Sequence, residues 1–390
     1  MQDDFFKYQA QTTPHPLALE ISHAKGSYIF DTRGKAYLDF VAGVSATPLG
    51  HRHPKVISAI KDQLDKYLHV MVYGEYIQKP AVELSKLLAD NLPESLDTTY
   101  LVNSGTEAIE GSIKLARRFT GRSEIIAAKN AYHGNTMGAL SLMDYQERKQ
   151  PFLPLLPDIK HITFNCEFCL NQITEKTAAV ILETIQGGAG FIEPTDNYLK
   201  KVRQRCSEVG ALFILDEIQP GFGRTGKLFG YENYDCIPDI LVTGKGLGGG
   251  MPIGAFSASE QMMDSLSDHP KLGHITTFGG HPVNCAASLA TLQHLLSTDI
   301  MQEVEKKEQL FRENLQHPQI KEIRGEGLML AIEFEDEELA QKVVEQSLEK
   351  GLILFYFLFT KTAIRITPPL TISEEEIIEG CENIKGILET

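Results

Sequence analysis

ALFILDEIQPGFGRTGKLFGYENYDCIPDILVTGKGLGGGMPIG, residues 211–254, is the stretch around which the chain is organised. An apolar run, Leu212–Leu215, ends at Asp216. A second run, Ile240–Val242, leads to Lys245 and a glycine cluster. In an open α/β sheet, ligands bind at the carboxyl ends of the strands, so we expect these two opposite charges to meet there. The stretch predicts a cofactor site and not a surface ion pair.

Length, composition and charge set the broad class. A chain of 390 residues suits two or more domains, or one large α/β domain with an attachment. A hydrophobic content of 42% is ordinary for a globular protein and can bury a large core. The formal net charge of −15 argues against nucleic acid or an anionic membrane as a partner, because both select for patches of Lys and Arg.

The N-terminal segment and the cysteines bear on the compartment. MQDDFFKYQAQTTPHP, residues 1–16, lacks a basic segment followed by an apolar core, so no signal peptide is expected. The strongest apolar run, Leu352–Phe359, is far shorter than the roughly 20 residues that span a bilayer as a helix. Six cysteines do not suggest a disulfide framework, and a reducing, cytoplasmic compartment is the simplest interpretation.

Strand-like and helical patterns alternate through the middle of the chain. The strand candidates are Thr98–Val102, Glu124–Ala128, His161–Phe164, Ala178–Leu182, Leu212–Leu215, Ile240–Val242 and Gly254–Ser257, with helices expected at Ser104–Phe119 and Asp196–Val209. Such alternation predicts an α/β fold with a mostly parallel central sheet and helices on both faces.

The two ends of the chain have other patterns. Ser27–Asp31 and Ala36–Phe40 look like strands joined by a turn, and helical periodicity follows at Pro54–Leu68 and Lys79–Asn91. After Gly280 an α+β pattern comprises Asn284–Leu296, Met301–Gln316, Ile320–Gly325, Leu328–Phe334, Glu337–Lys350, Leu352–Phe359, Ala363–Ile366 and a last helix near Ser373–Leu388. We expect residues 1–50 to contribute to a small domain, residues 51–285 to form the large ligand-binding domain, and residues 286–390 to form the small α+β domain.

Ser104, Gly105 and Thr106 join a strand to the start of a helix. Their hydroxyls and backbone N–H groups can bind an anion, with the helix dipole assisting. The alternative is a capping box between Ser104 and Glu107, which needs no ligand.

Two further motifs carry less weight. Gly221–Lys227 matches GxxxxGK of a P-loop, but Leu228 stands where Ser or Thr belongs and no strand leads directly into it. A flexible loop is the better interpretation. Cys166 and Cys169, with His161 nearby, have the CxxC spacing of zinc or redox sites, but no second pair completes a four-ligand zinc site, so an ordinary loop is expected.

Lys245 and Asp216 are the strongest chemical candidates. A flexible lysine before an open glycine loop lets a bulky group reach its amine, and an amine with a depressed pKa forms imines. The alternatives are a solvent-exposed Lys245 before a turn and Asp216 as a helix N-cap. Tyr132, before His133 and Gly134, either stacks on a planar ring or belongs to the core.

These motifs together closely resemble the class-III aminotransferases that depend on pyridoxal 5'-phosphate (PLP). The resemblance covers about residues 26–373 and rests on NSGTEA at 103–108, YHG at 132–134, LDEIQPGFGRTG at 215–226, GKGLGGGMPIGA at 244–255, TTFGGHP at 276–282 and IRITPPLTI at 364–372. It implies the aspartate-aminotransferase-like fold, type I of the PLP-dependent enzymes, with PLP bound in the large domain.

The resemblance also implies residue roles. Lys245 attaches the cofactor and then acts as general base, while Asp216 keeps the ring nitrogen protonated so that the ring accepts electrons. Gly105 and Thr106 hold the phosphate, and Arg365 binds a substrate carboxylate. The other cofactor-binding residues implied are Ser104, Tyr132 on the ring face, His133, Glu183, Gln219 at the ring hydroxyl, and Thr277, which reaches the phosphate of a neighbouring subunit in a homodimer.

The implied reaction is ping-pong transfer of an amino group from an amino acid, ornithine-like, acetylornithine-like or another ω-amino donor, to a 2-oxo acid such as 2-oxoglutarate. An aminomutase or epimerase on the same fold is the alternative; it would consume no separate 2-oxo acid.

Two departures from the family bear on the substrate. Many members carry a Glu that pairs with the arginine when an ω-amino donor is bound, and here Gly188 stands in its place. Arg365 would then stay available, which favours substrates with an α-carboxylate in both halves of the reaction. The substrate segment is Val72–Tyr76, where Tyr73, Glu75 or Tyr76 could meet the distal end of the substrate.

Overall fold

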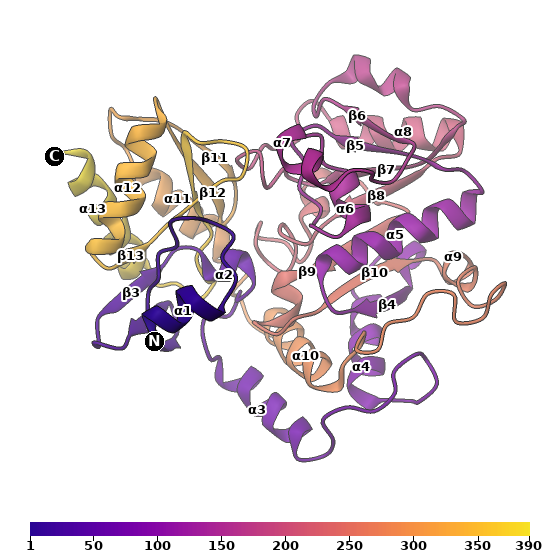
Figure 1. Ribbon diagram of the computed structural model, residues 1–390, viewed down its shortest axis with the longest axis horizontal. Coiled ribbons are helices and arrows are strands. Elements are labelled where there is room, and N and C mark those ends of the chain that lie inside the picture. The colour runs from indigo at the N-terminus through magenta and orange to yellow at the C-terminus, as the bar shows by residue number, and fades with distance from the viewer.

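A seven-stranded sheet lies at the centre of the larger of two lobes (Figure 1) in the computed structural model, which describes residues 1–390. The strand order is β4–β10–β9–β8–β7–β5–β6. Their bounds are β4 Thr98–Val102, β5 Glu124–Ala128, β6 Ile159–Ile162, β7 Thr177–Glu183, β8 Leu212–Asp216, β9 Ile240–Gly244 and β10 Gly254–Ala258. Strands β5 to β9 run parallel, whereas β10 is antiparallel to both of its neighbours. The expected α/β fold with a mostly parallel sheet is confirmed.

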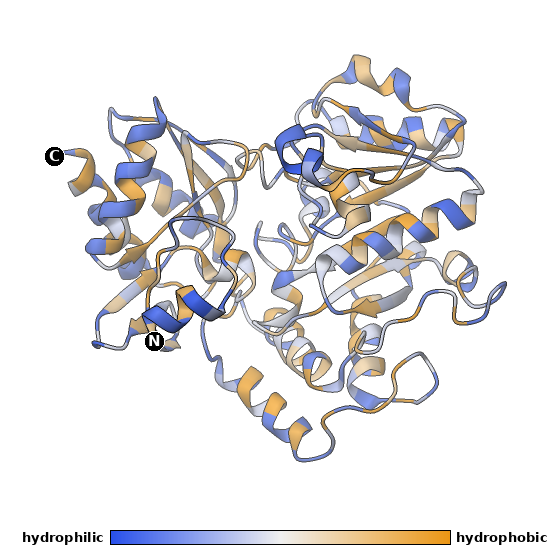
Figure 2. Ribbon diagram, in the orientation of Figure 1, coloured by the Kyte–Doolittle hydropathy of each residue, from blue (hydrophilic) through white to orange (hydrophobic).

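Helices cover both faces of this sheet because successive strand residues point in opposite directions. In β7, Val180 packs in the same core as Val202 of helix α8. Its neighbour Ile181 packs in a second core with Ile113 of helix α5. Strands buried on both faces have continuous apolar sequences, and the sheet is accordingly mostly apolar in colour in Figure 2.

The remaining helices of the larger lobe surround these layers. Their bounds, with those of α5 and α8, are α3 Pro54–Leu64, α4 Lys79–Ala89, α5 Gly105–Thr120, α6 Met137–Ser141, α7 Gln146–Lys149, α8 Tyr198–Val209, α9 Glu260–Asp264 and α10 Pro282–Leu296. Short 3₁₀ turns lie at Glu94–Leu96, Gln150–Phe152, Glu167–Gln172, Gly230–Tyr234 and Lys245–Gly248. None of the helices combines the length and apolar composition that crossing a lipid bilayer needs.

The smaller lobe contains both chain termini (Figure 1) and two four-stranded sheets. One has the order β1–β2–β3–β13, formed by Ile21–Lys25, Tyr28–Asp31, Ala36–Asp39 and Leu352–Ile353; the other has the order β11–β12–β15–β14, formed by Ile320–Glu326, Met329–Phe334, Ala363–Ile366 and Phe355–Tyr356. Its helices are α1 Gln2–Tyr8, α2 Ala42–Ser45, α11 Val304–Asn314, α12 Glu337–Glu349 and α13 Glu374–Leu388. Parallel pairing of Leu38 with Leu352 joins the N-terminal segment to the C-terminal unit. The domain boundaries after residues 50 and 285 stay predictions.

Three details differ from the sequence expectations. The run Leu352–Phe359 is not one strand, because Leu354 separates β13 and β14, which join different sheets. Strand β6 begins two residues before the expected start at His161, and β1 was not expected.

Residues 221–225 of the loop of the GxxxxGK match are buried, whereas Lys227 is exposed, and the expected flexibility stays a prediction. Arg224 in this loop is 1% exposed and donates hydrogen bonds from its guanidinium to the carbonyls of Leu328 and Pro368. The loop therefore fastens the larger lobe to the smaller one, and nucleotide binding is not its role.

Cys166 and Cys169 are joined by a disulfide, whereas an ordinary loop was expected here. Cys166 is the N-cap of the 3₁₀ turn Glu167–Gln172 and Cys169 lies within that turn. The other four cysteines are buried and free.

Candidate active site

The carboxyl ends of three adjacent strands bring charged side chains into one cavity between the lobes. Glu183 ends β7, Asp216 ends β8, and Lys245 follows β9 directly. All three line a cavity of about 520 Å³. Arg365 of strand β15 lines it from the smaller lobe. The meeting of Asp216 and Lys245 inferred from the strand ends is thus present in the structure.

Lys245 is held so that its amine is free of carboxylate partners. Its backbone has φ of 40°, in the left-handed region, at the turn that leaves β9. None of the ion pairs in the structure includes Lys245 or Arg365. Burial lowers the pKa of Lys245, with the charge of Arg365 adding to the effect and Asp216 opposing it. A buried amine with a lowered pKa is a competent nucleophile and base.

Asp216 is oriented by two donors. The backbone N–H of Ile218 donates to Oδ1 at 2.9 Å, and Nδ1 of His133 lies 2.8 Å from Oδ2. Burial opposes the charged imidazole, but the hydrogen bond and the charge of Asp216 prevail and raise the pKa of His133. Through this contact His133 holds the Asp216 carboxylate in one orientation, in which it can pair with a basic ring nitrogen.

Glu183 organises the loops of the cavity. Its carboxylate accepts the N–H of Gly187 at 2.9 Å and that of Tyr132 at 3.2 Å. Burial raises the pKa of Glu183 to about 7. Since both oxygens already bind backbone amides, Glu183 positions Tyr132 and the Gly187 loop.

The N-terminus of helix α5 forms the end of the cavity next to Gly134. Ser104 is the N-cap, with Oγ accepting the N–H of Glu107 at 3.3 Å. Glu107 accepts the N–H of Asn103 at 2.8 Å, so the expected capping box is displaced by one residue. Gly105 and Thr106 line the cavity, and amides of a first helical turn have no acceptor within the helix. These amides are available to an anion.

Glycines allow the close approach at this end. A Cβ on Gly134, whose φ is 131°, would lie 2.2 Å from Oγ1 of Thr106. A Cβ on Gly254 would lie 2.1 Å from the carbonyl oxygen of Ser104. Any larger residue at either position would push the helix N-terminus out of place.

Arg365 presents a guanidinium at the opposite side. Its Nε donates to the carbonyl of Tyr356 at 3.1 Å, and its Cζ lies 4.8 Å from the ring centroid of Phe357. Burial lowers the pKa of Arg365 to about 10, which leaves it charged at neutral pH. A buried guanidinium without an acidic partner suits a planar carboxylate ligand.

The structure adds cavity residues that the sequence patterns did not single out. Val44 lines the cavity from a left-handed turn in which Ala42, Val44 and Ser45 have φ of 50°, 60° and 65°. Gln219, which the family resemblance did imply, lines the same cavity and donates to Oγ of Ser45 at 3.3 Å. A β-branched residue such as Val44 rarely adopts this left-handed conformation, so the backbone is strained here. Such strain is typical of functional segments, and the amino-acid composition does not reveal it. The other lining residues missed are Asn135, Gly187, Ile218, Pro220 and residues 355–358.

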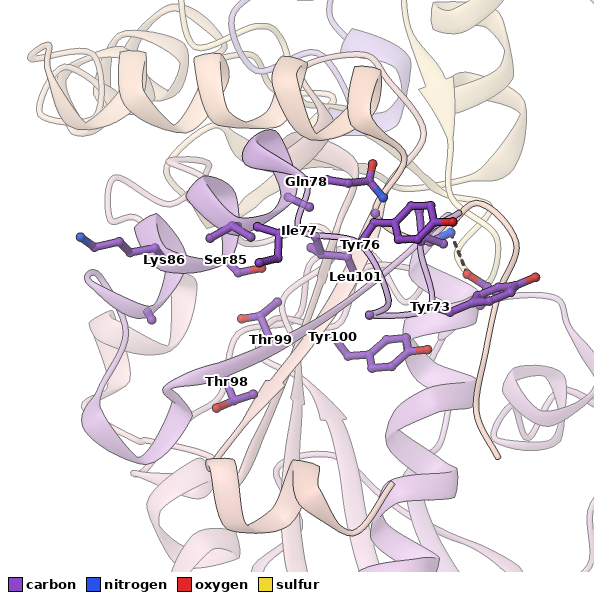
Figure 3. Close-up of a pocket in the computed structure, with 18 of the residues that line it drawn as sticks. Tyr73, Tyr76, Ile77, Gln78, Ser85, Lys86, Thr98, Thr99, Tyr100 and Leu101 are labelled. Atoms are coloured by element: carbon purple, nitrogen blue, oxygen red, sulfur yellow. Dashed lines mark hydrogen bonds between the residues drawn. The ribbon is translucent and has the colours of Figure 1, made fainter. Parts of the chain in front are cut away.

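Three predicted site residues do not line this cavity: Ser104, which caps α5, and Tyr73 and Thr277, which lie elsewhere. Tyr73 lines a separate groove of about 620 Å³ with Tyr76, Tyr100 and Thr276 (Figure 3). Thr277 is exposed on the loop before α10. Neither lines the cavity of Lys245 in this chain.

Comparisons with known proteins agree with this geometry. The family model described as aminotransferase class-III matches residues 8–388. The acetylornithine aminotransferase of Caldanaerobacter subterraneus subsp. tengcongensis is 41% identical over 376 residues, 93% of each chain. The putrescine aminotransferase of Pectobacterium atrosepticum is 40% identical over 378 residues, covering 92% of this chain and 80% of the relative.

A solved structure extends the likeness to the fold. Ornithine aminotransferase from Toxoplasma gondii, crystallised with partial occupancy of PLP at its active site, superposes with a TM-score of 0.91 at 31% identity. The alignment covers 100% of this chain and 94% of that one.

Proposed function

The chain belongs to the class-III aminotransferase family, and on that premise we propose how its residues hold the cofactor and divide the work of amino transfer. The protein is an aminotransferase that uses PLP. One observation carries the assignment of roles: Lys245, free of acidic partners, shares a buried cavity with Asp216, which His133 fixes in place.

The residues present fit PLP at each of its functional groups. The amides of Gly105 and Thr106 at the α5 N-terminus suit the phosphate. Asp216 suits the protonated ring nitrogen, and the unpaired amine of Lys245 suits the aldehyde. Tyr132 and Gln219 line the same cavity and are proposed to contact the ring face and the ring hydroxyl.

When bound, PLP supplies an electron-accepting ring that stabilises negative charge on the substrate carbon. The chain supplies the rest. Asp216 keeps a proton on the ring nitrogen, and Lys245, once its amine is free, carries a proton from the substrate carbon as general base. Its lowered pKa leaves a larger neutral fraction near neutral pH than an ordinary lysine has. Arg365 orients the substrate through its carboxylate.

For the substrates, we propose an ornithine-like or acetylornithine-like amino acid as donor and a 2-oxo acid such as 2-oxoglutarate as acceptor. Support comes from the acetylornithine aminotransferase relative and from the open guanidinium of Arg365. Ping-pong kinetics follow if both substrates use this one cavity in turn. No finding favours the aminomutase or epimerase alternative.

We further propose a homodimer in which Thr277 serves the phosphate site of the partner and Tyr73 the partner's substrate. Exposed apolar side chains near Thr277 and near Tyr73 support an interface, among them Ile77 at 95%, Phe278 at 52% and Tyr76 at 57%. Mixing Lys245→Ala protein with Thr277→Glu protein tests this. Shared sites predict activity that neither variant has alone, and an active monomer in sedimentation would refute them.

The cytoplasmic location stays a proposal. It is supported by the four free cysteines, whereas the Cys166–Cys169 disulfide does not argue for it.

A donor screen tests the proposed reaction. Amino acids are offered to the PLP-loaded protein with 2-oxoglutarate or pyruvate, and the new amino acid is measured. The proposal expects product only when a 2-oxo acid is present. Conversion of an amino acid without any 2-oxo acid would contradict it and indicate an isomerase.

A further inference from the structure

The Cys166–Cys169 pair is a chemically reactive feature that amino transfer does not use. It follows β6, the edge strand of the seven-stranded sheet, and neither cysteine lines the cavity of Lys245. The two cysteines are joined by a disulfide and are half-buried, while Phe168 between them is 85% exposed. The pair thus lies at the protein surface, where a molecule from solution can reach it.

This disulfide is poorly suited to stabilising the fold. It joins residues only three positions apart in the sequence, and the stabilisation that a cross-link gives by restricting the unfolded chain is smallest for the shortest loops. Exposed disulfides are generally the labile ones, whereas structural disulfides resist reduction. A reversible role therefore fits the pair better than a structural one.

Hydrogen bonds hold the turn independently of the two sulfur atoms. The N–H of Cys169 donates to the carbonyl of Cys166 at 3.1 Å. Asn165 fastens the start of the turn, because its Nδ2 donates to the carbonyl of Glu193 at 2.9 Å and its Oδ1 accepts the N–H of Thr195 at 3.0 Å. The turn should therefore keep its shape when the disulfide opens.

The same turn keeps the two thiols close together in the reduced form. The Cα atoms of Cys166 and Cys169 are 5.4 Å apart, inside the range of about 4.4–6.8 Å that disulfides have. A group held next to its reaction partner reacts as if it were present at very high concentration. The pair can therefore close again without a rearrangement of the backbone.

The two sulfur atoms differ in their surroundings. Cys169 packs against the main hydrophobic core, which includes the neighbouring Leu170. Cys166 takes no part in that packing and precedes the turn as its N-cap. An incoming thiolate therefore reaches Cys166 more readily, and Cys169 is placed to act on Cys166 from within the turn.

The remaining cysteines do not compete with this pair. Each is at most 3% exposed, and burial raises the pKa of each thiol to about 12: Cys206, Cys236, Cys285 and Cys381. Because the thiolate is the reactive form of cysteine, these four stay unreactive near neutral pH. Thiol chemistry in the folded protein is thus confined to one turn.

Zinc binding does not account for the pair. A structural zinc ion takes four ligands. His161, the nearby histidine, donates from Nε2 to the carbonyl of Leu142 at 3.0 Å and is not turned to the cysteines as a ligand. No group of three or more His, Cys, Asp or Glu side chains gathers as metal ligands would.

We infer that Cys166 and Cys169 form a thiol–disulfide exchange site for small thiols and small disulfides, in which Cys166 is the sulfur attacked and Cys169 is the resolving thiol. The site is separate from the cavity of Lys245, so the inference does not depend on the proposed aminotransferase function.

The exchange runs in two balanced steps. A thiolate from solution attacks Sγ of Cys166, the bond between the two cysteines breaks, and Sγ of Cys169 leaves with the electron pair and takes a proton from water. A second thiolate attacks the small-molecule sulfur of the mixed disulfide, and Cys166 leaves and is protonated in the same way. Two electrons thus pass from two small thiols, which become one disulfide, to the pair. Oxidation of the pair by a small disulfide is the reverse.

A redox titration of the full-length, PLP-loaded protein tests the inference. The protein is equilibrated in glutathione buffers that range from oxidised to reduced, quenched with acid, alkylated in denaturant and mapped by mass spectrometry. We expect Cys166 and Cys169 to pass together from disulfide to two thiols across this range, while the other four cysteines stay free thiols. The near-UV circular dichroism should stay that of the native protein.

Three results of the titration would overturn the inference. The pair could stay oxidised in reduced glutathione, or stay reduced in oxidised glutathione. Reduction could also abolish the native circular dichroism, which would make the disulfide structural. None of these results bears on amino transfer, which is measured separately.

Two matched substitutions test the roles of the two sulfur atoms. Reduced Cys169→Ser retains only Cys166 in the turn, and reduced Cys166→Ser retains only Cys169. In oxidised glutathione, we expect Cys169→Ser to gain glutathione at least about tenfold faster, and to keep it. Wild type should not accumulate this adduct, because Cys169 displaces it. Equal rates in the two variants, or an adduct that persists in wild type, would contradict the assigned roles and with them the inference.

Discussion

At the scale of single residues, the role of each charged side chain in the cavity depends on its burial and on whether it has a hydrogen-bond or ion-pair partner. Asp216 is paired with His133, Glu183 with backbone amides, and Lys245 with no acidic group. The two cations that remain unpaired, Lys245 and Arg365, are the ones proposed to bind the cofactor and the substrate. The difference between structural and chemical roles therefore lies in which charge is left without a partner.

Lys245 should react as an amine at lower pH than other lysines. Its lowered pKa means that the neutral form appears at a lower pH, so we expect its reductive methylation in the cofactor-free protein to reach half of its maximal rate below pH 10.5, the ordinary value. Mass mapping after short exposure at several pH values measures this. Lys227, exposed at the end of the loop Gly221–Lys227, is the internal control. The same midpoint for both lysines would contradict the burial argument.

At the scale of elements, helix α5 shows two roles side by side. Ser104 caps the helix, while Gly105 and Thr106 line the cavity. The sequence patterns left both the cap and the anion site open, and the structure is compatible with both because different atoms serve each role. The sequence alone could not assign the cap to Ser104 and the anion site to Gly105 and Thr106, because that assignment depends on where Gly134 packs.

Substitutions in α5 should separate these roles. Ser104→Ala should lower the free energy of unfolding by about 1 kcal/mol, because one N-cap bond is lost. Thr106→Val should instead weaken PLP binding more than it changes stability. Urea unfolding of the cofactor-free proteins and PLP titration measure the two effects. A larger loss of PLP affinity in Ser104→Ala than in Thr106→Val would contradict this division.

The other elements show which helix and strand bounds the local sequence pattern predicts and which depend on tertiary structure. Thr98–Val102 and Glu124–Ala128 were predicted with the bounds that the structure has, because short runs rich in β-branched and apolar residues are local features. The run Leu352–Phe359 was not, because its first part, β13, pairs with β3 near the N-terminus, whereas β14 pairs with β15 of the other sheet. The left-handed turn at Val44 could not be predicted from the local sequence, because a β-branched residue such as valine does not favour that backbone conformation.

At the scale of the whole molecule, the active site depends on how the lobes are fastened. Arg224 reaches two carbonyls of the smaller lobe, and the N–H of Leu328 donates to the Arg224 carbonyl at 2.9 Å. Burial lowers the pKa of Arg224 to about 9, so the side chain remains largely charged at neutral pH. The stretch Gly221–Lys227, which resembles a P-loop, therefore connects the two lobes and so places Arg365 opposite Lys245.

Arg224→Met should destabilise the protein while nearly preserving volume. Two buried carbonyls lose their donor, so we expect a loss of about 2–4 kcal/mol in the free energy of unfolding. Urea unfolding measures this, with Lys227→Met in the same loop as the control. A decrease in the free energy of unfolding no larger than that of Lys227→Met would show that the contact between the lobes does not depend on Arg224.

The central claim is that amino transfer passes through Lys245. The most direct measurement is borohydride reduction of the PLP-loaded protein followed by peptide mapping with mass spectrometry. The account predicts reduced cofactor on the peptide that contains Lys245, and none after Lys245→Ala. Cofactor attached to another lysine, or no attachment in a protein that still transfers amino groups, would contradict it.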